Sequence, residues 1–278
     1  MKQAFERLFE QGEQNNGRIK ENDYIGVDGL WYCGNCYTPK QVQVELFGTI
    51  RKPFCICKCE KEQRDKEEEA YKRREFEEKV KKLRHMGFPE SDMQNWTFAN
   101  DDMTNEPITK AMQKYVDNFA ELQKQGKGLL LYGAVGTGKT YAACEVANAL
   151  IDNGIPARVT DFSRMINTIQ GTFEKQEFID SLNDFKLLVI DDLGIERNTE
   201  FAQEQVYNII NSRYRANLPM IITTNLSIEQ IKKPENIEHM RIYDRILERC
   251  FPIEVAGGSR RRKAVRESYN DMKELLGL

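Results

Sequence analysis

Eight consecutive residues near the middle of the chain have the composition and spacing of a loop that binds phosphate. They are, in order, Gly133, Ala134, Val135, Gly136, Thr137, Gly138, Lys139 and Thr140. Glycines let successive backbone N–H groups turn toward one anion, and a helix that begins at the loop adds the positive end of its dipole. We expect Lys139 to reach the β- and γ-phosphates of ATP and Thr140 to ligate Mg²⁺.

Two later apolar runs end in side chains that suit the same chemistry. Asp191 and Asp192 follow the run 187–190, and Asn225 follows the run 220–224. We expect Asp191 to hold Mg²⁺ and Asp192 to orient and deprotonate the attacking water. Asn225 is then expected to hydrogen-bond the γ-phosphate or that water. Because the aspartate at 192 reaches about one CH₂ less far than the commoner glutamate, the sequence predicts slower hydrolysis.

Five of the seven cysteines lie close together in the first quarter of the sequence. Cys33 and Cys36 form a C-x2-C pair, and Cys55, Cys57 and Cys59 follow a strand-like stretch. Two such groups facing each other across a hairpin are typical of a zinc ribbon, in which four thiolates surround Zn²⁺. We favour Cys57 and Cys59 as the second pair of ligands, with Cys55 as the alternative. A redox role for the first pair is less favoured, because the βαβ pattern of thioredoxin-type motifs is missing.

The apolar runs predict the elements that must position these residues. The expected strands are residues 129–132, 156–160, 187–190, 220–224 and 251–255. Continuous apolar runs are typical of parallel strands that are buried on both faces. We therefore expect an α/β fold with a central parallel sheet flanked by helices. Fewer than thirty residues follow Val255, which is too few for a full helical lid.

Composition divides the chain into three expected parts. Residues 1–60 should hold an N-terminal helix and the zinc module, 61–95 a connector helix and linker, and 96–278 the nucleotide domain. Glu, Lys and Arg dominate the connector, whose one narrow apolar stripe suits either a solvated helix or a partner-docking surface. Phe98, ahead of the first strand, is a candidate contact for the adenine or a core aromatic.

Bulk properties exclude several classes of protein. The 278 residues carry a formal net charge of −3 and a pI near 5.7, which argues against coating duplex DNA by charge alone. No apolar run approaches the about 20 residues that span a bilayer, and residues 1–6 do not resemble a signal peptide. We therefore expect a cytoplasmic protein with no membrane contact.

Arginines near the C-terminal end are candidates for the nucleotide site. Arg245 lies in a helical stretch before the last strand, where it could enter the site of a neighbouring subunit as a finger. Arg241 and Arg249 are its competitors, and surface ion pairs are the alternative for all three. In the basic tail 257–263 we expect Arg261 at the nucleotide, while contact with nucleic acid or with solvent stays open.

Taken together, these motifs resemble the DnaC/DnaI-type AAA+ helicase loaders and the related IstB-like ATPases over about residues 96–266. The resemblance implies an AAA+ P-loop NTPase without a full lid, ATP hydrolysis, and self-association through the ATP sites. It also implies that the N-terminal part grips a hexameric replicative helicase. The cysteine module and charged helix are similar to those of loaders of firmicute and phage type, whereas IstB transposition helpers lack such a module.

The resemblance further implies contacts with single-stranded DNA in the segment between the second strand and Asp191. The candidate residues are Phe162, Arg164 and Phe173. Stacking of a base on an aromatic ring suits a protein without an overall basic charge, although Phe173 suits the core equally well. Two other functions stay open: an IstB-like ATPase that acts on duplex DNA in transposition, and a nucleotide-gated adaptor with negligible turnover.

Overall fold

The computed structural model describes residues 17–194, 199–234, 236–260, 269, 272–273 and 275–276. The chain forms two compact units, Met1–Glu77 and Glu78–Leu278, and the boundary lies inside helix α2 (Lys58–Gly87). None of the helices in the described ranges combines the length and the apolar character needed to cross a membrane.

The N-terminal unit is built from two small antiparallel hairpins. Strand β1 (Tyr24–Ile25) pairs with β2 (Trp31–Tyr32), and β3 (Val44–Leu46) pairs with β4 (Thr49–Arg51). Strands of two or three residues bury little apolar surface, so they need another source of stability. The N-terminal helix that we expected ahead of them falls on residues outside the described ranges.

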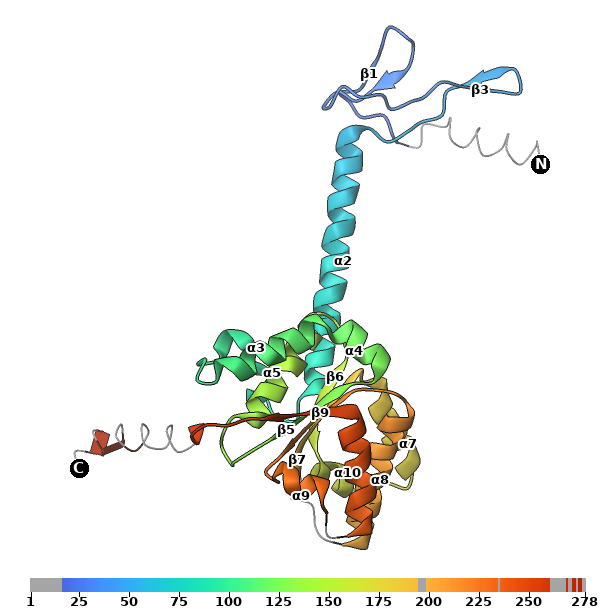
Figure 1. Ribbon diagram of the computed structural model, residues 1–278. Helices are drawn as coiled ribbons and strands as arrows, with labels where there is room; N and C mark the ends of the chain where they lie inside the picture. The colour runs from blue at the N-terminus through green and yellow to red at the C-terminus, as the bar shows by residue number, and fades with distance from the viewer. Residues whose placement is uncertain are drawn as a thin grey trace. The chain divides into compact units, whose positions relative to one another are not determined.

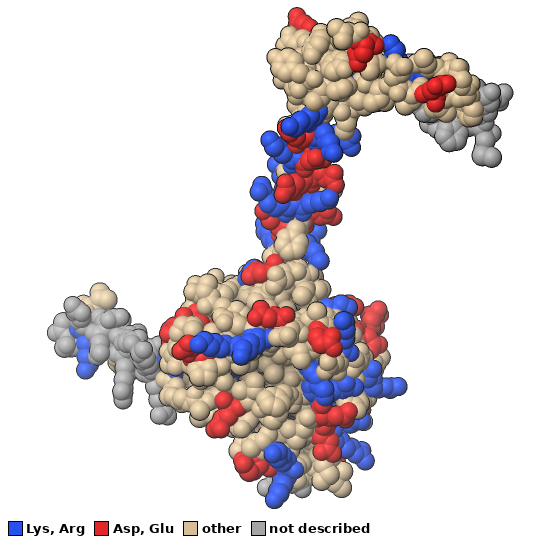
Figure 2. Space-filling model, turned by 45° about the horizontal axis from the view of Figure 1, so that its top comes forward, with Lys and Arg blue, Asp and Glu red and all other residues tan. Residues whose placement is uncertain are grey.

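Helix α2 is long and highly charged, as the sequence predicts. Lys/Arg and Asp/Glu side chains interleave along it (Figure 2), with ion pairs such as Glu68–Lys72 at 2.6 Å. Its apolar stripe divides in two: Tyr71 and Phe76 are exposed, whereas Leu83 is buried in the core of the C-terminal unit. The last turns of the helix therefore belong structurally to the C-terminal unit.

The C-terminal unit contains a five-stranded parallel sheet in the order β6-β7-β8-β5-β9 (Figure 1). Its strands are β5 (Gly128–Tyr132), β6 (Ala157–Asp161), β7 (Leu187–Leu193), β8 (Met220–Thr224) and β9 (Cys250–Glu254). This sheet confirms the fold class and the strands expected from the apolar runs. Because β5 and β7 flank β8, the residues that follow these three strands meet at one edge of the sheet, where open α/β sheets bind ligands.

Helices cover both faces of this sheet, and alternate strand residues separate the two cores. Leu129 and Leu131 face one core, whereas Leu130 faces the other. The first face carries α3 (Glu106–Asp117), α4 (Phe119–Gln125) and α5 (Lys139–Asp152). The second face carries α6 (Phe162–Gly171), α7 (Lys175–Ser181), α8 (Glu200–Arg215), α9 (Ile228–Lys232) and α10 (Ile237–Arg249). Short 3₁₀ turns occur at η1 (Asp92–Asn95), η2 (Phe98–Asn100) and η3 (Leu182–Asp184).

Candidate nucleotide site and cysteine cluster

The glycine-rich loop connects β5 directly to the first turn of α5. Gly136 and Gly138 have φ values of 83° and 97°, a conformation that residues with a Cβ rarely adopt. Lys139 is only 5% exposed, and its Nζ donates to two backbone carbonyl oxygens of the loop at 2.8 and 3.0 Å. It also donates to Asn225 Oδ1 at 2.7 Å, so the fold brings this lysine and the predicted sensor together.

Thr140 and Asp191, our two expected Mg²⁺ ligands, are in direct contact. Asp191 Oδ1 accepts a hydrogen bond from Thr140 Oγ1 at 2.8 Å and another from the hydroxyl of Thr223. Burial raises the pKa of Asp191, while these two hydroxyl donors act in the opposite direction. Carboxylate and hydroxyl oxygens are ligands that Mg²⁺ prefers, so the pair suits a magnesium ion bound beside the loop.

Asp192 owes its position to a bulge in β7. Between Ile190 and Leu193 the pairing with β8 shifts by one residue, and Asp192 has a φ of 57°. Its backbone N–H donates to Thr223 Oγ1 at 3.0 Å, which gives this hydroxyl a bond to each of the two aspartates. The sequence alone indicated no separate role for Thr223, although it lies at the polar end of β8, two residues before Asn225.

A small pocket of about 10 Å³, close to the size of one water molecule, lies beside the loop, between α3, α5 and the segment after β9. Thr137 and Gly138 of the loop line it together with Tyr141 and Glu145 of α5. Phe98 packs against the core of the same sheet face, which agrees with the alternative of a core aromatic.

Arg260 lies against the phosphate loop. Its backbone N–H donates to Gly136 O at 2.8 Å, and its guanidinium pairs with Asp101 at 3.3 Å and Asp102 at 3.4 Å. Arg261, the residue that we expected at the nucleotide, is outside the described ranges. The basic composition of the tail thus indicated this region of the site, and the fold places Arg260 against the loop.

The three candidate finger arginines differ in their surroundings. The Arg245 guanidinium lies 4.7 Å from the ring centroid of Tyr207 and donates to the hydroxyl of that tyrosine at 3.0 Å. Arg249 packs in the same way on Tyr214, at 4.6 Å, whereas Arg241 is exposed. Arg245 stays our predicted finger, but it would have to leave Tyr207 to enter a neighbouring site.

The segment with the candidate DNA contacts separates into buried and exposed residues. Phe162 is 1% exposed and packs in the core, so the prediction that it contacts DNA is wrong. The side chain of Asp161 caps the start of α6 by accepting a hydrogen bond from Arg164 N. Phe162 is the first residue of that helix, and its ring packs into the core. Arg164 is exposed and pairs with Asp161 at 3.6 Å. Phe173, between α6 and α7, is fully exposed, so the alternative of a core residue is wrong there.

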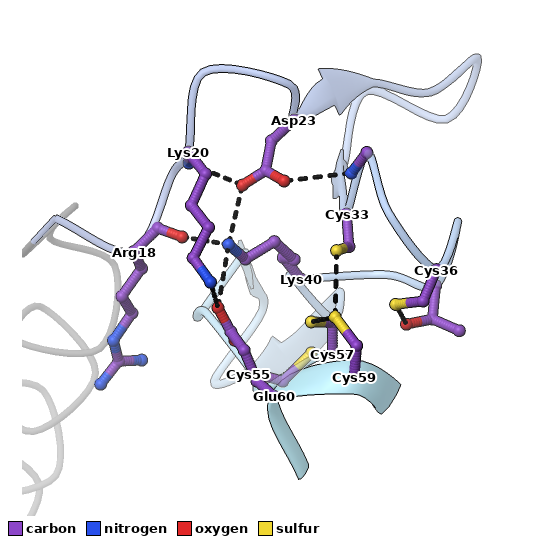
Figure 3. Close-up of polar contacts among 12 residues, drawn as sticks. Arg18, Lys20, Asp23, Cys33, Cys36, Lys40, Cys55, Cys57, Cys59 and Glu60 are labelled. Carbon is purple, nitrogen blue, oxygen red and sulfur yellow. Dashed lines mark hydrogen bonds and ion pairs between the residues drawn. The ribbon is translucent and has the colours of Figure 1, made fainter. Parts of the chain in front are cut away.

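The cysteine cluster forms in the N-terminal unit (Figure 3). The Sγ atoms of Cys33, Cys36, Cys57 and Cys59 all lie within 4.8 Å of one another. A tetrahedral zinc site with Zn–S bonds of about 2.3 Å has sulfur atoms about 3.8 Å apart, so this donor set fits Zn²⁺. The Sγ of Cys55 instead donates to Pro39 O at 3.5 Å. The cluster thus contains the four cysteines that we favoured.

A buried charged network connects the two halves of this cluster (Figure 3). Lys40 is 0% exposed, and its Nζ lies 2.7 Å from Asp23 Oδ2 and 3.4 Å from Glu60 Oε1. The other oxygen of Asp23 accepts from Gly34 N at 3.1 Å. Because Gly34 lies in the C-x2-C turn and Glu60 follows Cys59, the network holds both pairs of cysteines in place.

A comparison with protein families matches residues 64–268, most of the chain, to the family described as "IstB-like ATP binding protein". The chain belongs to the IstB-like ATP-binding family. This IstB-like chain is 26% identical over 201 residues to the replicative helicase loader DnaI of Bacillus subtilis, covering 66% of the chain and 64% of DnaI. It is 23% identical over 145 residues to the replicative helicase loader DnaC of Escherichia coli. That match covers 50% of the chain and 59% of DnaC. The match thus spans less than two thirds of each relative.

Solved structures agree with the fold of this IstB-like chain. The crystal structure of DnaI matches 64% of the chain with a TM-score of 0.54 and 22% identity, and 98% of that structure is covered. The crystal structure of the DnaC helicase loader matches 60% with a TM-score of 0.50 and 23% identity, and is covered completely. These matches confirm the AAA+ P-loop fold and the resemblance to DnaC/DnaI-type proteins.

Proposed function

We propose that this IstB-like protein is an ATP-dependent loader of a hexameric replicative DNA helicase at the initiation of DNA replication. ATP binding and hydrolysis would control its grip on the helicase and on single-stranded DNA. The observation that carries the proposal is the nucleotide site of Lys139, Thr140, Asp191 and Asn225 in a chain related to two proteins named as loaders. The protein would act in the cytoplasm.

At the nucleotide site each side chain has a proposed task. Bound Mg²⁺ would supply the positive charge that neutralises the phosphate oxygens. Thr140 and Asp191 would hold the ion, and Lys139 would exchange its loop carbonyls for phosphate oxygens. Asp192 would orient the attacking water. Asn225, which already contacts Lys139 at 2.7 Å, would bind the γ-phosphate, and Arg245 of a neighbouring copy would complete the site.

We propose that the N-terminal part binds zinc and forms the surface that contacts the helicase. Residues 1–60 would form the zinc module, 61–95 the connector and 96–278 the ATPase domain. The module exposes several apolar side chains that suit protein contact: Ile25, Val27, Tyr37, Phe47, Ile50 and Ile56. A partner that covers them would bury surface that is otherwise in contact with water.

A co-elution experiment with the cognate hexameric helicase tests the loader proposal. The full chain is compared with a shortened chain that begins at Glu78, each with and without ATP. A start near Met86 would remove Val80 and Leu83, which pack in the core of the C-terminal unit. We expect the full chain to co-elute and the shortened chain to lose the helicase while still binding ATP. If the full chain does not co-elute with the helicase either with or without ATP, the loader proposal fails.

Replacing Phe173 with alanine is expected to weaken binding of single-stranded DNA by about tenfold. The ring is fully exposed, and stacking of one base contributes about 1–3 kcal/mol, where 1.4 kcal/mol is tenfold in affinity. Fluorescence anisotropy with a labelled oligonucleotide measures the effect at constant salt. Tyr71→Ala, which removes an exposed aromatic from α2, is the matched control. Unchanged binding by the Phe173 variant would remove this loop from the DNA site.

A role in transposition is the second candidate function. Besides the family itself, the chain is 26% identical over 162 residues to a protein named as an ATP-binding protein in an insertion sequence of Mycobacterium tuberculosis. That role predicts ATP hydrolysis stimulated by duplex DNA and no helicase partner. A nucleotide-gated adaptor is the third candidate, and it predicts that Asp192→Asn leaves the biological function intact.

A further inference from the structure

Strand β8 contacts both aspartates of the nucleotide site through the hydroxyl of Thr223. This side chain is 0% exposed, donates its O–H to Asp191 Oδ1 and accepts from the backbone N–H of Asp192 at 3.0 Å. A hydroxyl has one hydrogen to donate and two lone pairs that can accept, so its donor and one acceptor position are in use. The hydroxyl therefore links the side chain of the proposed Mg²⁺ ligand to the backbone of the proposed water-orienting residue.

The backbone at Asp192 needs support because it departs from the regular strand. The register with β8 shifts between Ile190 and Leu193, and the φ of 57° at Asp192 is one that residues with a Cβ rarely adopt. Such a conformation persists when its surroundings fix it, and it is frequent at functional sites. After the bulge, Thr224 donates its hydroxyl to Leu193 O at 2.7 Å. Two consecutive threonines of β8 thus hold the bulge, and Thr223 is the one that contacts the aspartates.

The position of Thr223 differs from that of the residues expected to touch the nucleotide. Asp191 Oδ1 also accepts from Thr140 Oγ1 at 2.8 Å, but Thr140 follows the phosphate loop directly and is itself a proposed Mg²⁺ ligand. In the described part of the chain, both hydrogen-bond partners of the Thr223 hydroxyl belong to β7. Any effect of this hydroxyl on the reaction would therefore pass through the two aspartates.

We propose that Thr223 is a positioning residue for ATP hydrolysis, whose hydroxyl holds Asp191 and Asp192 in the arrangement that the reaction needs. The inference rests on the proposed ATPase activity and adds a residue that shapes the site without touching the nucleotide. Without the hydroxyl, the N–H of Asp192 loses this partner and the bulge can relax, which displaces the carboxylate that would orient the water. The phosphate loop and Lys139 lie on other elements, so ATP binding should persist.

The variant Thr223→Val tests the proposal, because it keeps the shape of the side chain and removes the hydroxyl. In the full-length protein at saturating ATP and Mg²⁺, we expect kcat for phosphate release to fall by about 10- to 100-fold, since small displacements of a catalytic group have effects of this size. The Kd for a fluorescent ATP analogue should change by less than about threefold. Thr223→Ser restores the hydroxyl and should recover kcat to within about threefold of the wild-type value.

Two further variants separate positioning from a general loss of stability. Thr160→Val makes the same change at a buried position of β6 and should keep the wild-type kcat. Thr223→Cys provides a second measurement if the valine variant misfolds, because the thiol is a weak donor and a weak acceptor. Its kcat should lie between those of the valine and serine variants. The melting temperature of each variant identifies any that loses structure.

The outcomes separate this inference from the function on which it rests. A wild-type kcat in Thr223→Val, or in Thr223→Cys where the valine variant misfolds, would overturn the inference, as would a serine variant as slow as the valine variant. A fall in ATP affinity with kcat unchanged would assign Thr223 to binding instead. An equal loss of kcat in Thr160→Val would make the stability of the sheet responsible. A wild-type protein that binds ATP but does not hydrolyse it would contradict the proposed ATPase activity, and the inference would fail with it.

Discussion

Replacing Lys139 with alanine is expected to lower the affinity for ATP by about 10- to 100-fold and to abolish hydrolysis. The ammonium group lies within the loop and contacts Asn225 at 2.7 Å, where phosphate oxygens would replace its present carbonyl partners. A hydrogen bond to a charged group contributes about 1.5–3 kcal/mol, and 1.4 kcal/mol corresponds to tenfold in affinity. Titration with a fluorescent ATP analogue and a phosphate-release assay measure the two effects.

Two other variants serve as comparisons for the Lys139 variant: one is a control, and the other separates ATP binding from hydrolysis. Lys110→Ala removes an exposed lysine from α3 and should leave both binding and hydrolysis unchanged. Asp192→Asn should bind ATP normally and lose hydrolysis, because it changes only the proposed water-orienting group. Wild-type ATP affinity in the Lys139 variant would mean that the loop is not the nucleotide site.

Replacing Cys57 with serine is expected to release zinc and unfold the N-terminal unit. Cys57 is 1% exposed at the centre of the cluster, and the surrounding strands are only two or three residues long. A structural zinc site of this kind contributes about 10–16 kcal/mol of apparent binding free energy, which is also folding free energy. Metal analysis should give one zinc per wild-type chain, and limited proteolysis should cut residues 17–57 in the variant.

Cys55→Ser is the matched control for the cluster, because the side chain of Cys55 points to Pro39 O instead of the other sulfur atoms. It should keep its zinc and its resistance to protease. If Cys55→Ser lost its zinc and Cys57→Ser kept it, the fourth zinc ligand would be Cys55 and not Cys57. ATP binding should survive in both variants, because the nucleotide site lies wholly within the other unit.

Much of the fold followed from local patterns in the sequence. The run 187–190 is apolar throughout and the run 220–224 begins with three apolar residues, a pattern typical of parallel strands that are buried on both faces. The phosphate loop was equally clear, since its glycines and Lys139 act within eight residues. The cysteine pairs were recognisable because zinc ligands follow short spacings. Spacing alone left Cys55 as an alternative ligand, and only the fold places its side chain outside the cluster.

Other features depended on contacts between distant segments, which no local pattern encodes. Phe162 and Phe173 have the same side chain, but the orientation of α6 buries the first and leaves the second exposed. Arg260 meets Asp101 across 159 positions of the sequence, and Thr223 meets Asp191 across 32. Glu145 looks like an ordinary helix residue until the packing of α3, α5 and the segment after β9 encloses its carboxyl group. Spacing along the chain determined which residues can do chemistry, whereas burial and long-range packing decided which of them face a ligand.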